Sequence, residues 1–494
     1  MRIMIASNLL PPEMIGGYEV LCAQMAGYLA SRHEVRVVTS LAGLYERRPL
    51  AGSGGPAGEA SAVPAPGYEV RRVLPPPVGY ALERSGNPGL FDPGIAQLHR
   101  GFDQESAALV LREVEDYHPD LIYAFNPLGV GPIGVLAVLA ATAPLVVHLQ
   151  DPLDLTVGDL AGSDDLLGGL WSAAKARSWA ISCSSVILPG NSRIGRFARV
   201  ELVPNWVPPV AVRAGTAHRR DSGAGGRQAR ELRAVYFGQL LAHKGADRAV
   251  EAAGVFNDRF GSLSLDVYGD LNNSFAQSLT ARTERSRWGE RVRFLGRLPH
   301  DELLAALGAY DVAILPLPES EPGALAVLEA MSVGCPVVTT CPAGATEWLA
   351  PGDEYLPIPP QASPVLIAET LAGAVSSGAL EQLGEASRRA VEERFDLEGV
   401  VGPRVEEILA EAAAHLGPGD WYGGLRAARR LLYARRLLGG GQVQQGSGAG
   451  RFRYRLVDEV VEAGDRLGVP WGLIRDRTRL AGHLARRIAS RRSR

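Results

Sequence analysis

The sequence predicts an α/β protein with two doubly wound, Rossmann-like domains and a basic, helical C-terminal extension. In each half of the chain, short β-branched runs alternate with helical patterns, which is typical of a parallel sheet covered by helices. Residues 207–230, between the halves, are rich in Gly, Ala and Arg and indicate a linker. A length of 494 residues also exceeds what one compact core accommodates. We therefore expect domains over residues 1–206 and 231–394.

The first domain is predicted to begin with a strand at its N-terminus. Its strands are expected at Met1–Ser7, Glu34–Ser40, Asp120–Ala124 and Leu145–Leu149, and its helices over Tyr18–Leu29 and around Gly131–Ala141. The Gly/Ala/Pro/Ser-rich stretch Leu50–Pro66 indicates a long surface loop.

The second domain repeats the same rhythm after the linker. Its strands are expected at Ala234–Phe237, Ser264–Tyr268, Val292–Leu295, Val312–Leu315 and Pro336–Thr340. Ligands of doubly wound sheets bind beyond the carboxyl ends of the strands, so the site is expected in the loops that follow these strands.

Composition favours a soluble, cytoplasmic protein. The net charge of −3 gives no reason to expect a nucleic-acid substrate. The four Cys form no C-x-x-C pair, which excludes the usual zinc-ribbon pattern and fits a reducing compartment. The N-terminus lacks a signal-peptide pattern, and the longest apolar stretch, Ile133–Val147, is too short to span a membrane.

The segment Leu315–Thr340, LPLPESEPGALAVLEAMSVGCPVVTT, is the most informative in the chain. A buried strand ends in a Pro-rich loop with Glu321, and a helix opens near Ala324 with Glu329 about one and a half turns inside it. The free N–H groups at a helix N-terminus suit a diphosphate, and Gly323 lets a ligand approach the backbone. The two carboxylates can accept hydrogen bonds from two separate groups of hydroxyls. A nucleotide-sugar offers two such groups, a hexose at one end and a ribose at the other. The alternative is two ordinary surface Glu beside a helix.

This segment resembles the E-x7-E motif of retaining glycosyltransferases of family 4, which have the GT-B fold of two Rossmann-like domains facing a deep cleft. The resemblance implies that Glu321 contacts the donor sugar and that Glu329 binds the ribose hydroxyls. It also implies that the amides of Gly323, Ala324 and Leu325 meet the phosphate or the sugar. Family members usually have Gly-Phe-Gly or similar where this chain has Pro-Gly-Ala.

A second motif, YFGQLLAHKGADRAVEA (Tyr236–Ala252), places a cation just before a helix, where phosphate binds readily. It resembles the FVGRL-x3-KG signature of the same family. The resemblance implies that Lys244, one of only two Lys in the chain, binds phosphate and stabilises the leaving group, with Gly238 and Gln239 beside the donor. Gln239 replaces the usual Arg, so half of the cationic clamp is absent. The alternative is a surface Lys in a loop.

The first domain contributes a Gly pair, Gly16-Gly17, after its first strand. Such a pair lets the backbone approach a ligand, and the resemblance implies the donor phosphate or the acceptor. The alternative is a plain tight turn. Asn126 ends a later strand near the expected cleft and is a candidate sugar or acceptor contact.

The stretch HLQDPLD (His148–Asp154) ends another strand of the first domain. Family members commonly carry His-Asp here, and in this register Gln150 and Asp151 occupy the pair. His148 lies on the same strand face as Gln150 and is a candidate substitute, although a core or surface His is a competing interpretation. We expect a catalytic role for Asp151 and sugar or acceptor contacts for His148 and Gln150.

The sequence lacks the motifs of several other enzyme classes. The chain has no D-x-D triplet, which argues against metal-dependent glycosyltransferases, and it has neither a P-loop nor a G-x-S-x-G elbow. We therefore expect no metal site and no cofactor, because the nucleotide-sugar is itself a substrate.

The resemblance covers about Val203–Tyr355, and residues 395–417 resemble the family's closing helix back to the first domain. It favours retaining transfer of a hexosyl group to an unidentified glycan, lipid-linked or small-molecule hydroxyl. The alternatives are another GT-B enzyme, such as an epimerase or phosphorylase, and an inactive sugar-nucleotide-binding or scaffolding partner.

Residues 418–494 resemble nothing in the family. From Trp421 on, this extension has 17 Arg against five acidic residues. Three interpretations of this extension are open. It is a solvated extension or a packing helix pair, it binds anionic lipid or a lipid-linked acceptor at the inner face of the membrane, or it binds a protein or nucleic-acid partner.

Overall fold

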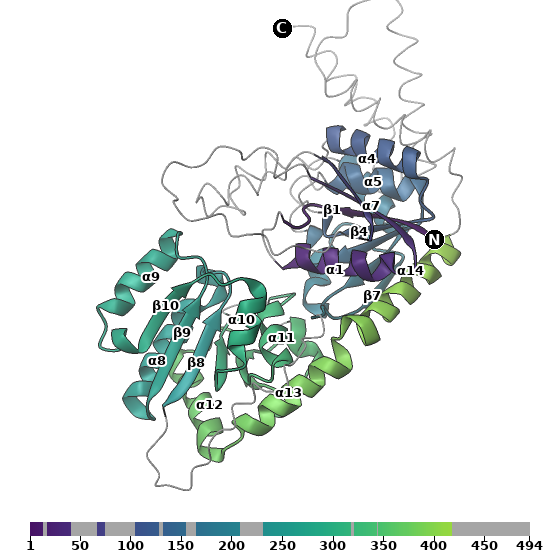
Figure 1. Cartoon of the computed structure of the whole chain (residues 1–494). Helices are drawn as coiled ribbons and strands as arrows, with labels where there is room; N and C mark the ends of the chain where they lie inside the picture. The colour runs from purple at the N-terminus through teal and green to yellow at the C-terminus, as the bar shows by residue number, and fades with distance from the viewer. Residues whose placement is uncertain are drawn as a thin grey trace, which may run out of the picture. The chain divides into compact units, whose positions relative to one another are not determined.

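The computed structural model contains two units, each built on one parallel β-sheet (Figure 1). It describes residues 1–12, 17–40, 67–74, 104–127, 132–154, 165–207, 231–317, 321–342 and 344–416. Gly16, the expected loop 50–66, the linker beyond Val207 and the extension 418–494 lie outside these residues.

Unit 1 contains Met1–Ser182, Ile187–Leu202 and the chain from Val405 on. Its seven parallel strands follow the order β3-β2-β1-β4-β5-β6-β7. They are β1 (Arg2–Ser7), β2 (Glu34–Ser40), β3 (Glu69–Leu74), β4 (Leu121–Phe125), β5 (Leu145–Leu149), β6 (Ser178–Ser182) and β7 (Arg199–Leu202). The strand order reverses between β1 and β4, which makes that point the topological switch point where doubly wound sheets bind ligands.

Five described helices belong to unit 1. They are α1 (Tyr18–Ala30), α4 (Gln104–Tyr117), α5 (Pro132–Thr142), α7 (Asp165–Ala176) and α14 (Gly402–Leu416). Helices α4, α5 and α7 lie side by side (Figure 1). Helix α14 joins the unit through Glu406, which accepts hydrogen bonds from Tyr28 and His33, and through an apolar face that includes the fully buried Ile408 and Leu409.

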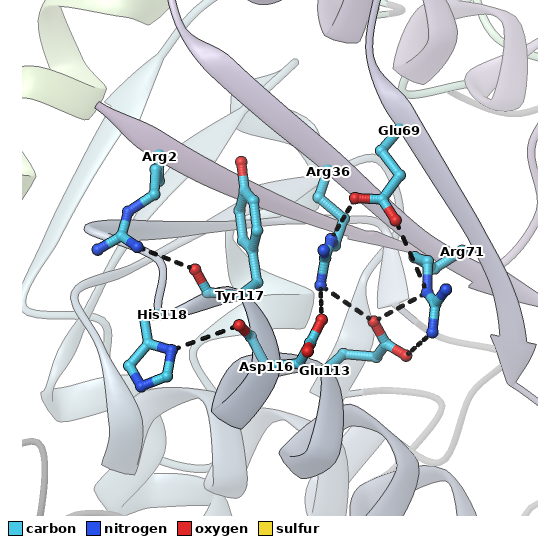
Figure 2. A network of polar contacts seen from close by, with 8 residues as sticks. All are labelled: Arg2, Arg36, Glu69, Arg71, Glu113, Asp116, Tyr117 and His118. Carbon is cyan, nitrogen blue, oxygen red and sulfur yellow. Dashed lines mark hydrogen bonds and ion pairs between the residues drawn. The ribbon is translucent and has the colours of Figure 1, made fainter.

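A polar network fastens β3 and α4 to β2 (Figure 2). Arg36 donates to Glu69 at 2.7 Å and to Asp116 at 2.6 Å, and Arg71 donates two bonds of 3.3 Å to Glu113. Arg36 and Glu69 lie near the amino ends of their strands. This network is therefore at the opposite end of the sheet from the switch-point loops, and we assign it a structural role.

Unit 2 contains Cys183–Val186 and Val203–Arg404. Its six parallel strands follow the order β10-β9-β8-β11-β12-β13, so its switch point lies between β8 and β11. They are β8 (Leu232–Phe237), β9 (Leu263–Tyr268), β10 (Val292–Gly296), β11 (Val312–Leu315), β12 (Val337–Thr340) and β13 (Leu356–Ile358). The helices are α8 (Ala246–Arg259), α9 (Ser274–Glu284), α10 (His300–Leu307), α11 (Leu325–Ser332), α12 (Pro364–Ser377) and α13 (Leu380–Arg394).

Every strand expected from the sequence is present, with ends displaced by at most two residues. Strands β3, β6, β7 and β13 were not expected. The edge strand β7 alternates between exposed and partly exposed residues, so it lacks the buried apolar run that marks a central strand. No helix in the described part of the chain is long and apolar enough to cross a membrane.

Candidate functional site

Lys244 and Glu321, which belong to separate motifs, meet in unit 2. Lys244 Nζ lies 2.6 Å from Glu321 Oε1, although the residues are 77 positions apart. Lys244 ends the short helix η5 (Ala242–Lys244) after β8, and Glu321 lies in the loop between β11 and α11. Both loops follow strands that flank the switch point, which is why the fold brings them together. Their side chains are 21% and 28% exposed, so a ligand can reach this pair.

The loop before Lys244 is held by Tyr236. The hydroxyl of this buried side chain donates to the carbonyl oxygens of Gln239 and Lys244, at 3.3 and 3.2 Å. Gly238 has φ 133°, a conformation that favours glycine, and Gln239 is partly buried beside it. The loop shape therefore depends on a glycine and a buried tyrosine within the motif.

The Glu321 loop is braced by Gly344, at the start of the short helix η7 (Gly344–Trp348). The N–H of Gly344 donates to the carbonyl of Glu321 at 2.7 Å. A Cβ on Gly344 would stand only 1.5 Å from the carbonyl oxygen of Pro322. Cys183 Sγ donates to the same Pro322 oxygen at 3.6 Å. No sequence motif includes Gly344, because its need for glycine arises from a contact with Pro322, which lies 22 positions away in the chain.

Helix α11 begins directly after Gly323 and Ala324. Ala324 caps it with φ 38° and ψ 42°, a left-handed conformation that is strained for a residue with a Cβ. The N–H of Val327 donates to the carbonyl of Ala324 at 2.9 Å, whereas those of Leu325 and Ala326, at the start of the helix, have no carbonyl partner within it and carry partial positive charge. The N-terminus of α11 therefore presents anion-binding groups beside Glu321.

Glu329 lies in the second turn of α11 and is bonded to His300, the first residue of α10. His300 Nε2 and Glu329 Oε1 are 2.9 Å apart. The hydrogen bond to Glu329 raises the pKa of His300 above its usual 6.5, and the nearby charges of Glu329 and Asp301 add to this against the opposing effect of burial. The sequence analysis singled out Glu329 but not His300.

At the carboxyl edge of the unit 1 sheet, Asn126 and Asp151 are joined. Asn126 Nδ2 donates to Asp151 Oδ2 at 2.9 Å, and the N–H of Asn126 donates to the carbonyl of His148. Asn126 has φ 45°, which asparagine tolerates better than most residues. These residues follow β4 and β5, and Gly17 caps the helix that follows β1. The structure thus gathers these sequence candidates around the switch point of unit 1.

His148 lies in the core. Its side chain is fully buried, its ring centroid is 4.5 Å from that of Phe125, and its Nδ1 is hydrogen bonded to the hydroxyl of Tyr123. Burial lowers the pKa of His148 to about 3, so the ring is neutral at physiological pH. Gln150, just beyond β5, is also buried. Asp151 is partly exposed, so its side chain is more accessible than those of His148 and Gln150.

The Asp151 turn rests on a buried ion pair. Lys175 Nζ lies 2.9 and 3.0 Å from the carboxylate oxygens of Asp154, and it donates to the carbonyl of Asn191 at 2.6 Å. Asn191 Nδ2 in turn donates to the carbonyl of Asp151 at 3.1 Å. Lys175, the second lysine of the chain, therefore has a structural role. Among the described residues, no group of three His, Cys, Asp or Glu side chains could hold a metal ion.

Residues 219–390 match the family described as "Glycosyl transferases group 1". This match lies within unit 2. The chain is 28% identical over 176 residues to the glycogen synthase of two Mycobacterium tuberculosis strains, CDC 1551 and H37Rv. The matched stretch is 36% of this chain and 42% of that protein, so the chain matches less than half the length of these curated relatives.

Solved structures are similar to a larger part of the chain. The sucrose-phosphate synthase of Thermosynechococcus elongatus superposes with a TM-score of 0.60 at 17% identity, covering 84% of this chain and all of that one. Anabaena HepE, in complex with UDP-glucose, superposes with a TM-score of 0.58 at 18% identity, covering 83% and 100%. At these identities the likeness establishes the fold, which is GT-B as expected.

Proposed function

We propose that this chain is a retaining glycosyltransferase that moves a hexosyl group from a nucleotide-sugar to a hydroxyl acceptor, with the donor bound on unit 2. The observation that carries the proposal is the 2.6 Å contact between Lys244 and Glu321. It joins the two motifs that the family resemblance assigns to the donor, within the segment that matches the group 1 glycosyltransferases.

The charges at this site suit a leaving diphosphate. An ammonium group has three N–H donors, and one of those on Lys244 is directed at Glu321, so the others can meet phosphate oxygens. The N-terminus of α11 supplies backbone N–H groups for the same anion. Lys244 then stabilises the charge that develops as the glycosidic bond breaks, and Glu321 fixes Lys244 and contacts the sugar hydroxyls.

The remaining roles follow the order of groups along a nucleotide-sugar. Glu329, about one and a half turns beyond the N-terminus of α11, accepts the ribose hydroxyls. The acceptor lies near Asn126 and Asp151 of unit 1. Retention is explained by attack from the face of the departing diphosphate, which takes the acceptor proton. Uridine diphosphate glucose is the first donor to test, because Anabaena HepE was solved with it.

Binding and turnover together test the proposal. Thermal shifts of the full chain are measured with UDP, GDP, ADP and TDP for the wild type, Lys244→Ala and Glu329→Ala, and release of nucleotide from the matching sugar donors is followed. Arg282→Ala, which removes a surface ion pair with Glu251, is the matched control. We expect one nucleotide to stabilise the wild type and the control more than the two site variants, and we expect release of that nucleotide from its sugar donor.

The alternative function is an inactive sugar-nucleotide-binding partner, which the replacement of the usual Arg by Gln239 favours. It predicts a thermal shift without release of nucleotide from any donor and acceptor offered. Equal shifts in the wild type and both site variants would place the nucleotide elsewhere and would contradict the proposed function.

A further inference from the structure

His300 is a titratable side chain that is bonded to the proposed donor-binding residue Glu329, and no family motif includes it. His300 is the first residue of α10. Its Nε2 lies 2.9 Å from Oε1 of Glu329 on α11, and the two atoms are hydrogen bonded. Glu329 is 21% exposed, whereas His300 is 48% exposed and lies on the solvent side of the pair. Among the described residues, the charged groups that face His300 are Glu329 on α11 and Asp301 on its own helix.

We propose that His300 is a positioning residue for nucleotide binding, which holds the Glu329 carboxylate so that its second oxygen accepts the ribose hydroxyls. This inference rests on the proposed function. A glutamate side chain loses rotamer freedom when it binds a ligand, and a carboxylate already held by a neighbour loses less. One oxygen of Glu329 is used by His300, and the other stays available for the ribose.

The hydrogen bond also makes nucleotide affinity depend on pH. Below the raised pKa of His300 the ring is charged, and a charge-assisted bond to a carboxylate is about twice as strong as a neutral one. As pH rises through that pKa the ring loses its charge, and its hold on Glu329 weakens. Nucleotide affinity therefore decreases across this step, which lies above pH 6.5, the usual pKa of histidine.

Isothermal titration of the full chain tests this inference with UDP, GDP and ADP and their 2′,3′-dideoxy analogues, between pH 5.5 and 8.5. At low pH we expect His300→Ala to weaken binding of the ribonucleotide about three- to tenfold, the size of one lost hydrogen bond. His300→Gln keeps an N–H donor and should recover much of the affinity without the pH step. The ratio of wild-type to variant affinity at each pH removes the titration of the nucleotide itself.

Two controls separate positioning from general damage. His33→Ala removes a second histidine–glutamate pair of the same 2.9 Å length, His33–Glu406 in unit 1, and should leave affinity unchanged. The dideoxy analogue lacks the ribose hydroxyls, so His300→Ala should not weaken its binding further. A lower His300 pKa in Glu329→Gln, measured by proton NMR, is expected independently of any nucleotide.

Wild-type affinity in His300→Ala, or an equal loss for the ribonucleotide and the dideoxy analogue, would overturn the inference while leaving the donor site in place. A pH step that persists in His300→Gln would also overturn it. If no nucleotide binds the wild type, or if Glu329→Ala binds as tightly as the wild type, the proposed function fails and the inference fails with it.

Discussion

Gly344 offers the sharpest test of how the donor loop is held. A Cβ at this position would lie 1.5 Å from the carbonyl oxygen of Pro322, the residue after Glu321. Nonbonded heavy atoms are most stable at about 3.5 Å, so Gly344→Ala forces one of the two backbones to move by well over an ångström. The hydrogen bond from Gly344 to the Glu321 carbonyl is then lost or distorted.

The expected effects follow from that displacement. Inserting one methyl group into a packed site costs about 1–3 kcal/mol. For a unit of this size each kcal/mol lowers the melting temperature by about 2–4 °C. Because a misplacement of about 1 Å costs on the order of 100-fold in rate, kcat/KM with a nucleotide-sugar donor should fall by about that factor.

The assay compares Gly344→Ala with Gly373→Ala. Gly373 is exposed within α12, and an added Cβ there meets nothing within 4 Å. Alanine should therefore stabilise that helix by about 0.5–1 kcal/mol and leave kcat/KM unchanged. A Gly344→Ala protein with wild-type kcat/KM and melting temperature would show that the Glu321 loop does not need glycine at position 344.

Four further outcomes are expected. Ala324→Gly removes a left-handed alanine and should raise stability in thermal unfolding by about 0.5–1 kcal/mol; a lower melting temperature would contradict the strain. Lys175→Met leaves the buried Asp154 carboxylate without its cation and should cost about 3–5 kcal/mol in urea unfolding. The double variant with Asp154→Leu should restore only part of this, because Trp171 Nε1 and the N–H of Ile194 then lose their acceptor. Because burial lowers the folded-state pKa of His148 to about 3, the unfolding free energy should fall as pH drops from 6.5 towards 3. This decrease in unfolding free energy at low pH should be smaller in His148→Gln. A decrease of equal size in the wild type and the variant would show that His148 does not cause it. Tyr236→Phe should raise the KM for the donor and cost about 1 kcal/mol, since two hydrogen bonds to the Lys244 loop disappear; an unchanged KM would show that the loop holds its shape without them.

The fold class and most of the strands could be predicted from the sequence, because periodicity and the placement of Gly and Pro are local properties. The sequence also marks Lys244, Glu321 and Glu329 as candidates, since these residues stand in motifs whose spacing is read within one segment. Strands such as β7 escaped prediction because an edge strand carries little apolar signal.

Which of these residues come into contact depends on how the chain folds in three dimensions. The Lys244–Glu321 contact, the clash that requires glycine at 344 and the His300–Glu329 pair each join segments that are 22 or more positions apart. The structure also placed His148 in the core, although it ends a strand near the candidate site. Strand alternation specifies a face of the sheet, whereas burial depends on the elements that cover that face.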